Sequence, residues 1–265
     1  MKEITYAELR TIQLDVLQYV HNFCQEHNIK YSLAYGTLLG AVRHGGYIPW
    51  DDDIDIAMLR DDYERFAKEF NERKGPYRFY DCRNDKDVHI AFGKVADTRT
   101  LIEEGASTKN LGVAIDVFPI DDLCDTYEKS RKYYRSFNFA KNLLILKCRN
   151  VSDVRSWWKK PIFAIVKVMT CWYPLHKISL KMTERILKKR NQNSIYVGSV
   201  VDGYENEIIT RRVWNEFDKI SFEGRIFNAV KDTHEYLSCQ YGDYMQLPPE
   251  KKRVPKHDFY KMYWL

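Results

Sequence analysis

The spacing of apolar residues in the first part of the chain predicts helices packed on a sheet. Within residues 6–27, apolar side chains recur every three or four positions, which places them on one helical face: Leu9, Ile12, Val16, Val20 and Phe23. Residues 53–58, Asp-Ile-Asp-Ile-Ala-Met, alternate polar and apolar side chains as a half-buried strand does. A second helix is predicted over residues 61–71, where aromatic side chains share one side.

Later segments predict the rest of a mixed sheet and then a change of character. Four short β-branched or aromatic runs predict strands at residues 77–83, 92–96, 100–103 and 113–119. From about residue 127 to 191 the pattern becomes helical and basic, and beyond it come a Phe-Glu-Gly turn, a helix ending near Gly242 and a Leu-Pro-Pro segment. The expected fold class is α+β, with a mixed-sheet core over residues 1–125 and a mainly helical region over residues 126–265.

Composition limits the classes of protein to consider. The net charge of +5 suits an anionic substrate or membrane surface, but lysines and arginines form no long runs interleaved with aromatics, so we expect no nucleic acid partner. Six cysteines are spaced singly, without the short pairs of a zinc site, which favours reduced thiols. The N-terminus is charged at once, and no apolar stretch reaches the ~20 residues of a spanning helix. We therefore expect a cytoplasmic protein.

The richest stretch of the sequence is residues 33–58, LAYGTLLGAVRHGGYIPWDDDIDIAM. Gly36 and Thr37 predict a tight turn with N–H groups free for an anion, and a short helix over residues 38–42 would favour a phosphate at its N-terminus. Arg43 follows as a cation that could clamp the same phosphate.

Two aspartates on one strand face predict a metal site. Asp53 and Asp55 would repel each other, and a divalent cation would offset that repulsion. Mg²⁺ takes oxygen ligands and is commonly shared between carboxylates and substrate phosphates, with Mn²⁺ as the alternative. The competing interpretations are an acidic exposed turn and a calcium loop, but the Gly and Glu of an EF-hand are missing.

A third carboxylate lies in the apolar run of residues 113–119. Burying Asp116 without a partner would be costly, so it should ligate the same metal or form a salt bridge with Arg43 or Lys94. Lys94 itself stands among apolar neighbours and either snorkels to the sheet edge or reaches into the site.

These motifs resemble the LicD family of phosphotransferases, which belongs to the nucleotidyltransferase-fold superfamily. The matching features are the turn at 36–37, PWDDDID at 49–55, IDVFP at 115–119, and YGDYM-x-LPP at 241–249 followed by His257. The resemblance implies a nucleotidyltransferase-like catalytic core over residues 1–125 and a C-terminal region that completes the acceptor side of the cleft. It also implies that Asp116 supplies the third acidic ligand.

The predicted site has three groups of residues with different roles. Asp53, Asp55 and Asp116 are the predicted catalytic and metal-binding residues. The predicted substrate-binding residues are Gly36, Thr37, Arg43, Lys94 and His257, the last as a general base, a substrate contact or a structural histidine.

The resemblance implies a metal-dependent transfer of phosphocholine from CDP-choline to a cell-envelope glycan, with release of CMP. The acceptor would be a teichoic acid, lipopolysaccharide or capsule precursor, free or lipid-linked. One alternative is a nucleotidyltransferase that modifies a small hydroxyl substrate. Another is a non-catalytic, membrane-associated protein of envelope assembly.

Tryptophans and lysines gather near residues 154–174. The segment carries Trp157, Trp158, Lys159, Lys160, Lys167, Trp172 and Tyr173, with Lys177 close behind. Such a pattern is typical of an interfacial helix on an anionic leaflet, and would place the protein on the inner face of the cytoplasmic membrane. Because tryptophans also fill cores, the alternative is a buried helix of the helical region.

Overall fold

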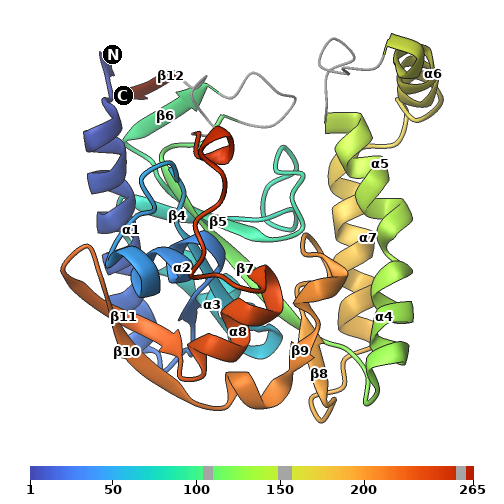
Figure 1. The fold of residues 1–265 in the computed structure, drawn as a ribbon. Coiled ribbons are helices and arrows are strands. Elements are labelled where there is room, and N and C mark those ends of the chain that lie inside the picture. The colour runs from blue at the N-terminus through green and yellow to red at the C-terminus, as the bar shows by residue number, and fades with distance from the viewer. Residues whose placement is uncertain (104–109, 149–156, 255–260) are drawn as a thin grey trace.

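A mixed sheet forms the centre of the molecule (Figure 1). The computed structural model describes residues 1–103, 110–148, 157–254 and 261–265. The main strand order is β2 (Ser32–Leu33), β3 (Asp55–Leu59), β7 (Ala114–Asp122), β5 (Gly93–Asp97) and β4 (Tyr77–Tyr80), and β8 (Tyr196–Gly198) and β9 (Ile209–Thr210) extend it from β7. Only the pairing of β3 with β7 is parallel among these described strands. The predicted α+β class with a mixed sheet is confirmed.

Two smaller sheets flank this one. β1 (Lys2–Glu3), β12 (Lys261–Trp264) and β6 (Thr100–Glu103) form one sheet, and β10 (Phe217–Phe222) and β11 (Arg225–Val230) form a hairpin. The assignment of residues 100–103 to the central sheet was wrong, because this run pairs with the C-terminal strand instead. The other neighbour of β12 is β1, and this second pairing brings the two ends of the chain together, as Figure 1 shows.

Eight α-helices cover the described chain. They are α1 (Tyr6–Glu26), α2 (Tyr35–His44), α3 (Arg60–Glu69), α4 (Tyr127–Arg135), α5 (Asn138–Cys148), α6 (Lys160–Met169), α7 (Leu175–Lys188) and α8 (Thr233–Tyr241). Short 3₁₀ turns occur at η1 (Phe70–Glu72), η3 (Trp157–Lys159), η4 (Glu205–Glu207), η5 (Arg211–Trp214) and η6 (Glu250–Lys252). Helix α1 begins with a capping box between Thr5 and Glu8, and its predicted apolar face is buried. Helices α4 to α7 lie where the sequence predicts helices from residue 127. The described residues beyond Lys188 differ from the predicted mainly helical region, because they contain five strands and one α-helix.

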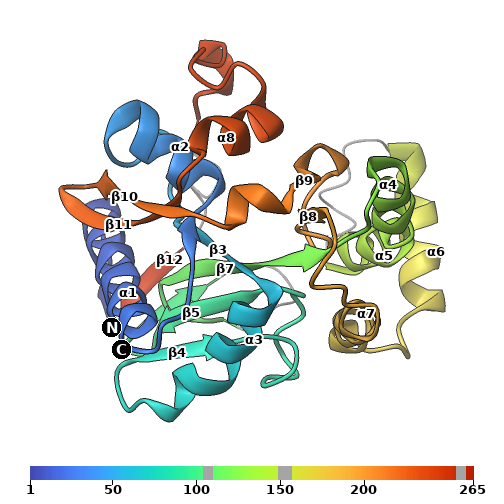
Figure 2. The ribbon, with the colours of Figure 1, turned by 90° about the horizontal axis from the view of Figure 1, so that it is seen from below.

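The buried apolar side chains form two clusters. The larger one lies between α1 and the central sheet and also takes in Trp214 and Phe227 from the C-terminal half. The smaller one joins α4 and α7 through Tyr134, Ile178 and Met182. Figure 2 shows α4, α5, α6 and α7 together on one side of the sheet. The boundary predicted near residue 125 therefore marks the change from strands to helices, while the larger core is shared across it.

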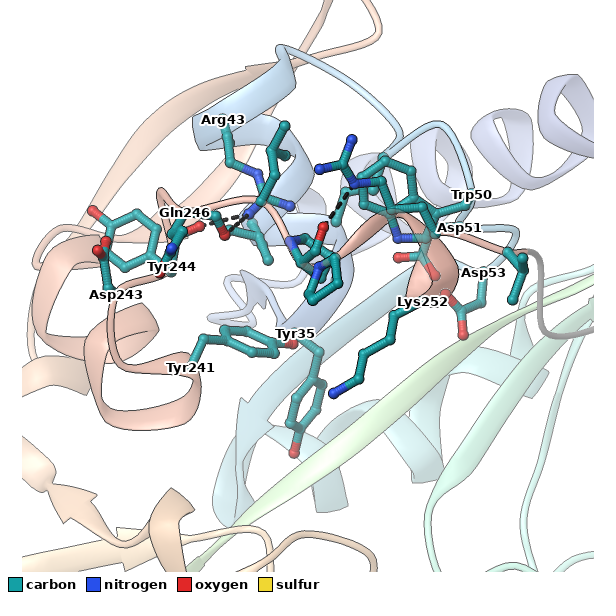
Figure 3. A pocket seen from close by; sticks show the side chains of 18 of the residues that line it. Tyr35, Arg43, Trp50, Asp51, Asp53, Tyr241, Asp243, Tyr244, Gln246 and Lys252 are labelled. Atoms are coloured by element: carbon teal, nitrogen blue, oxygen red, sulfur yellow. Dashed lines mark hydrogen bonds between the residues drawn. The ribbon is translucent and has the colours of Figure 1, made fainter.

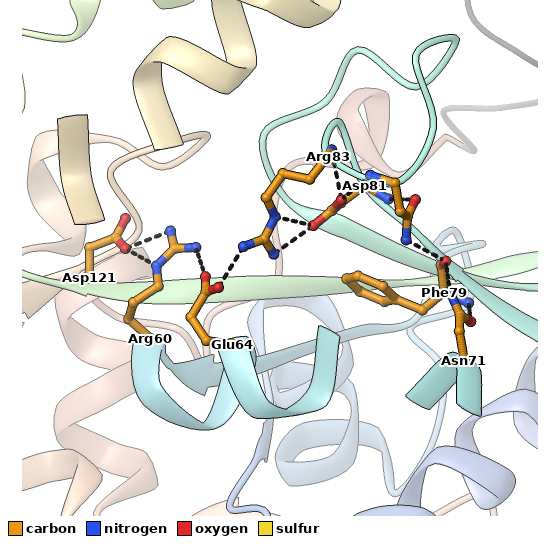
Figure 4. Close-up of polar contacts among 8 residues, drawn as sticks. Arg60, Glu64, Asn71, Phe79, Asp81, Arg83 and Asp121 are labelled. Atoms are coloured by element: carbon orange, nitrogen blue, oxygen red, sulfur yellow. Dashed lines mark hydrogen bonds and ion pairs between the residues drawn. The ribbon is translucent and has the colours of Figure 1, made fainter. Parts of the chain in front are cut away.

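A buried ionic network ties α3 to the sheet (Figure 4). The Arg60 guanidinium, 1% exposed, lies 2.6 Å from Asp121 Oδ1 at the end of β7, and the Asp121 side chain is fully buried. Arg60 also contacts Glu64 at 3.2 Å, and Glu64 in turn pairs with Arg83. Burial raises the pKa of Asp121, and the Arg60 charge opposes that shift. This network fixes the C-terminal end of β7, the strand that carries Asp116.

Replacing Arg60 by methionine should destabilise the fold strongly. Asp121 would be left buried without its cation, a loss of about 3–5 kcal/mol in the free energy of unfolding, measured by urea denaturation. Arg65→Met is the control, because Arg65 is 47% exposed and surface ion pairs contribute about 1 kcal/mol or less. Equal stability of the two variants would contradict the assigned role of the buried pair.

Candidate active site

Strand pairing aligns three charged residues in one row across the sheet. Asp55 on β3 lies opposite Asp116 on β7, and Asp116 lies opposite Lys94 on β5. The Asp116 N–H donates to the carbonyl of Ile54 at 2.9 Å, and Lys94 Nζ donates to Asp116 Oδ1 at 2.7 Å. Because residues in register share a face of the sheet, both carboxylates and the ammonium lie on one side. The structure therefore contains the salt bridge between Asp116 and Lys94 that the sequence offered as the alternative to a metal contact. The role of Lys94 as a substrate-binding residue stays a prediction.

The acidic loop, residues 45–54, is held by α1. Arg10 donates to the carbonyl of Asp51 at 2.8 Å, and the Gln13 amide donates to the carbonyl of Asp52 at 2.9 Å. These hydrogen bonds hold the backbone of the loop. The next two acidic residues of the chain, Asp53 and Asp55, therefore keep a fixed position at the start of β3.

The Phe-Glu-Gly turn of the β10–β11 hairpin supports the same loop. Glu223 accepts a hydrogen bond from the Tyr47 N–H at 2.9 Å. A Cβ atom on Gly46 would lie 2.1 Å from a Glu223 carboxylate oxygen, so a larger residue at this position would displace the Glu223 side chain. The hairpin therefore positions the site from the other end of the sequence.

Three consecutive carboxylates meet in the acidic loop. Oxygens of Asp51, Asp52 and Asp53 lie within 4.8 Å of one another, and the described residues contain no other such group of three acidic, histidine or cysteine side chains. The Asp52 carboxylate accepts from the Tyr6 hydroxyl at 2.9 Å, which directs it toward α1. Asp51 and Asp53 face the same cavity as Asp55. We call Asp51, Asp53, Asp55 and Asp116 the acidic cluster. The sequence predicted the last three of these as site residues, but not Asp51.

The negative charges of this cluster perturb one another. Burial raises the pKa of Asp55 well above its ordinary range, and the charges of Asp53, Asp116 and Asp51 raise it further. Burial also raises the pKa of Asp116, while the Lys94 ammonium lowers it. Ionising the whole cluster would require a compensating cation. The groups that the cluster offers to such a cation are all carboxylate oxygens, which are the ligands that Mg²⁺ prefers.

The N-terminus of α2 differs from the predicted phosphate turn. The helix begins at Tyr35 rather than Leu38, and Tyr35 has a positive φ of 45°, which is uncommon for a residue with a side chain. A Cβ atom on Gly36 would lie 2.3 Å from Asp51 Oδ2. The Asp51 carboxylate therefore lies against the helix start, where a phosphate was expected.

Thr37 contacts the backbone of β3. Its side chain is buried, and its Oγ1 accepts a hydrogen bond from the Asp55 N–H at 2.8 Å. This hydrogen bond fixes the backbone at the first residue of β3. Thr37 is not among the residues that line the cavity described below, and its role as a substrate contact stays a prediction.

A cavity of about 1070 Å³ opens over the acidic cluster (Figure 3). Its wall combines α2, the acidic loop and the C-terminal segment 241–254, with side chains from Tyr35, Arg43, Trp50, Asp51, Asp53, Asp55, Tyr241, Asp243, Tyr244, Lys252 and Arg253. Arg43 donates to the carbonyls of Tyr244 and Gln246 at 2.6 and 3.4 Å. The clamp predicted for Arg43 is therefore engaged with the backbone of the C-terminal segment.

A second, smaller cavity shares Asp53 with the first. It measures about 310 Å³, and its lining includes Lys94, Asp116 and Phe92. Asp53 therefore contributes to both cavities, whereas Asp51 and Asp55 line the larger one and Asp116 lines the smaller one. His257 lies outside the described residues.

A half-buried acid, Glu207 of η4, contacts the first residue of α2. The Tyr35 hydroxyl donates to Glu207 Oε2 at 3.0 Å, and Glu207 Oε1 accepts from the Tyr204 N–H at 2.8 Å. Burial raises the pKa of Glu207 to about 7. This pair could not be predicted from the sequence, because its members are 172 positions apart.

The site thus combines half-buried and buried carboxylates with a large cavity that has cations in its wall, an arrangement typical of sites for phosphorylated substrates. Comparison with known proteins agrees: a family described as LicD/FKTN/FKRP, nucleotidyltransferase domain, matches residues 28–150. The lipopolysaccharide cholinephosphotransferase LicD of Haemophilus influenzae is 30% identical over 276 aligned positions, which cover 97% of each chain. The ribitol 5-phosphate transferases FKRP of mouse and human are 40% identical over 48 residues, or 18% of this chain and 10% of each relative.

The full-length similarity decides the family. This chain belongs to the LicD family of phosphotransferases, as the motifs in its sequence had indicated.

The Glu207 pair predicts a pH dependence of stability. Its folded pKa of about 7 lies above the ordinary 4.5, so its contribution to stability is present at low pH and lost as the pH rises through this window. Relative to Glu207→Gln, the wild type should lose on the order of 2 kcal/mol between pH 5 and pH 8, measured by urea unfolding.

Glu205→Gln is the matched control. Glu205 is its near neighbour, but hydrogen bonds from Arg135 and Arg131 lower its pKa to about 2. Its substitution should therefore shift stability by the same amount at pH 5 and at pH 8. Parallel pH profiles for the wild type and Glu207→Gln would contradict the pKa shift assigned to Glu207.

Proposed function

We propose that this protein transfers a phospho-head-group, most directly phosphocholine, from a CDP-activated alcohol to a hydroxyl of a cell-envelope glycan. The observation that carries the proposal is the row of Asp55, Asp116 and Lys94, with Asp53 at the junction of two cavities. The name of the full-length Haemophilus influenzae relative supports phosphocholine and lipopolysaccharide as the head group and acceptor class.

The residues of the site have distinct tasks in this proposal. Asp53, Asp55 and Asp116 would hold Mg²⁺, or Mn²⁺ in its place, and the bound ion would neutralise charge on the phosphate oxygens during transfer. Thr37 fixes the backbone of Asp55 through its hydrogen bond. Lys94 orients Asp116, which would accept the proton of the attacking hydroxyl.

The two cavities suit the two substrates. Phosphoryl transfer places the attacking and leaving oxygens roughly in line, so donor and acceptor approach from opposite sides. The cavity of about 1070 Å³ is large enough for a nucleotide-activated donor, and the cavity of about 310 Å³ is lined by Asp53 and Asp116. We assign the donor to the larger cavity and the acceptor hydroxyl to the smaller one.

Aromatic side chains favour a cationic head group. Tyr35, Trp50, Tyr241 and Tyr244 all line the larger cavity. Ring faces attract quaternary ammonium groups such as choline, whereas a neutral polyol would gain little from them. This lining supports CDP-choline among the CDP-activated alcohols.

The tryptophan-rich segment is exposed, and we propose that it contacts the inner leaflet. Exposed fractions are 81% for Trp157, 77% for Trp172 and 71% for Val168, and no described side chain of α6 is buried. The alternative of a core helix is therefore not what the structure shows. Within the described residues, no helix has the length and apolarity needed to cross a bilayer. Between residues 160 and 190 the chain has eight lysines and arginines and one acidic residue, which complements an anionic surface.

The metal site predicts the behaviour of aspartate variants. Asp53→Asn or Asp116→Asn should lower the rate of CMP release from CDP-choline by roughly 10³-fold or more, because each removes a proposed metal ligand. Asp243→Asn, which removes an exposed carboxylate of the same cavity, is the control and should stay within roughly threefold.

The same assay, run with CDP-choline, CDP-ethanolamine, CDP-glycerol and CDP-ribitol, identifies the donor. Retention of the nucleotide on the acceptor would instead identify a nucleotidyltransferase. A normal rate in Asp53→Asn would contradict the metal site.

Vesicle binding tests the membrane contact. Binding should rise with anionic lipid content, and replacing Lys160 and Lys167 by glutamine should weaken it by about 1 kcal/mol per lysine, without changing cleavage of soluble donor. The control is Lys68→Gln with Lys74→Gln, two exposed lysines of the α3 region. If the wild type sediments equally with neutral and anionic vesicles, the segment does not recognise an anionic leaflet.

A further inference from the structure

Three cations line the larger cavity, and two of them are engaged with the backbone. Arg43 donates to the carbonyls of Tyr244 and Gln246. Arg253 Nε donates to the Pro248 carbonyl at 2.7 Å, and its guanidinium lies 5.7 Å from the ring centroid of Trp50. These two arginines therefore build the wall of the cavity.

The third cation, Lys252, is different. Its ammonium forms no hydrogen bond or ion pair with any residue that the structure describes. Figure 3 shows its side chain extending into the cavity toward Tyr35. A lysine held at a cavity wall with its charge uncompensated is suited to an anionic ligand.

The backbone beneath Lys252 is fixed. It ends the short turn η6, where its N–H donates to the Pro249 carbonyl at 2.8 Å and the Arg253 N–H donates to Glu250 at 2.9 Å. The contacts of Arg253 hold the next residue, so the base of the Lys252 side chain is fixed at the cavity wall. An ammonium on a fixed base can contact a phosphate without a rearrangement of the cavity.

The charges of the cavity explain why such a cation is needed. Four carboxylates line it, Asp51, Asp53, Asp55 and Asp243, so a diphosphate would meet strong repulsion. A metal on the acidic cluster would bind one side of the diphosphate. Its other side would face the wall that carries Lys252.

We propose that Lys252 is a substrate-binding residue that contacts the diphosphate of the nucleotide-activated donor. This inference rests on the proposed function, since it takes the larger cavity to be the donor cavity. It assigns to Lys252 the clamp that the sequence had suggested for Arg43. Lys94 cannot fill that place, because it lines the smaller cavity and pairs with Asp116.

The neighbouring Lys251 provides a matched control. It is an exposed lysine of the same turn, but it does not line the cavity. Lys252→Met should raise the KM for CDP-choline roughly tenfold or more, since hydrogen bonds to charged groups are strong, and should leave the melting temperature unchanged. Lys251→Met should leave both KM and melting temperature unchanged. The affinity of Lys252→Met for donor should also depend less steeply on salt.

Calorimetric titration separates this inference from the proposed function. Each variant is titrated with CDP-choline and with inorganic pyrophosphate, both in Mg²⁺. Weaker binding of both ligands by Lys252→Met alone supports the contact. If the wild type binds pyrophosphate through Lys252 but no CDP-alcohol, the donor assignment fails and the phosphate contact stands. Equal affinities of the Lys252→Met and Lys251→Met variants for both ligands would overturn the inference.

Discussion

The repulsion between Asp55 and Asp116 is the constraint on which the site depends. Parallel pairing of β3 with β7 sets the two carboxylates opposite each other, and both strands are buried too deeply to shift register. The carboxylates therefore cannot move apart to lower their repulsion. The Lys94 ammonium compensates the negative charge of Asp116. The proposed divalent ion would compensate the remaining negative charges of the acidic cluster. Apolar residues at these positions would pack into the sheet at lower cost in free energy. The stability of the sheet therefore does not explain this row of charges.

The remainder of the fold holds this unfavourable arrangement in place. At its far end, β7 is anchored by the buried pair of Arg60 and Asp121. The start of β3 is fixed by Thr37 from α2 and by α1 through the acidic loop. The C-terminal segment forms one wall of the cavity beside these elements, and Arg43 and the contact of Arg253 with Trp50 join it to them. The site therefore combines a sheet held by hydrogen bonds and ion pairs with a wall from the other end of the sequence.

Much of this site could be predicted from the sequence because strand alternation is a local signal. The pattern around Asp53 and Asp55 and the isolated charge of Asp116 located the acidic cluster, and the family motifs located the C-terminal segment. The direction of side chains could not be predicted. Thr37 turns inward because α2 begins three residues early, and Arg43 turns toward a segment 201 positions away. Asp51, Glu207 and Lys252 acquire their places from tertiary packing, which leaves no periodic trace in the chain.

The central claim is that the acidic cluster binds one divalent cation. Titration with Mn²⁺, followed by electron paramagnetic resonance, measures this directly without any substrate. The wild type should bind one Mn²⁺ that Mg²⁺ displaces, and Asp55→Asn should lose this site while Asp243→Asn keeps it. An unchanged Mn²⁺ affinity in Asp55→Asn would contradict the account.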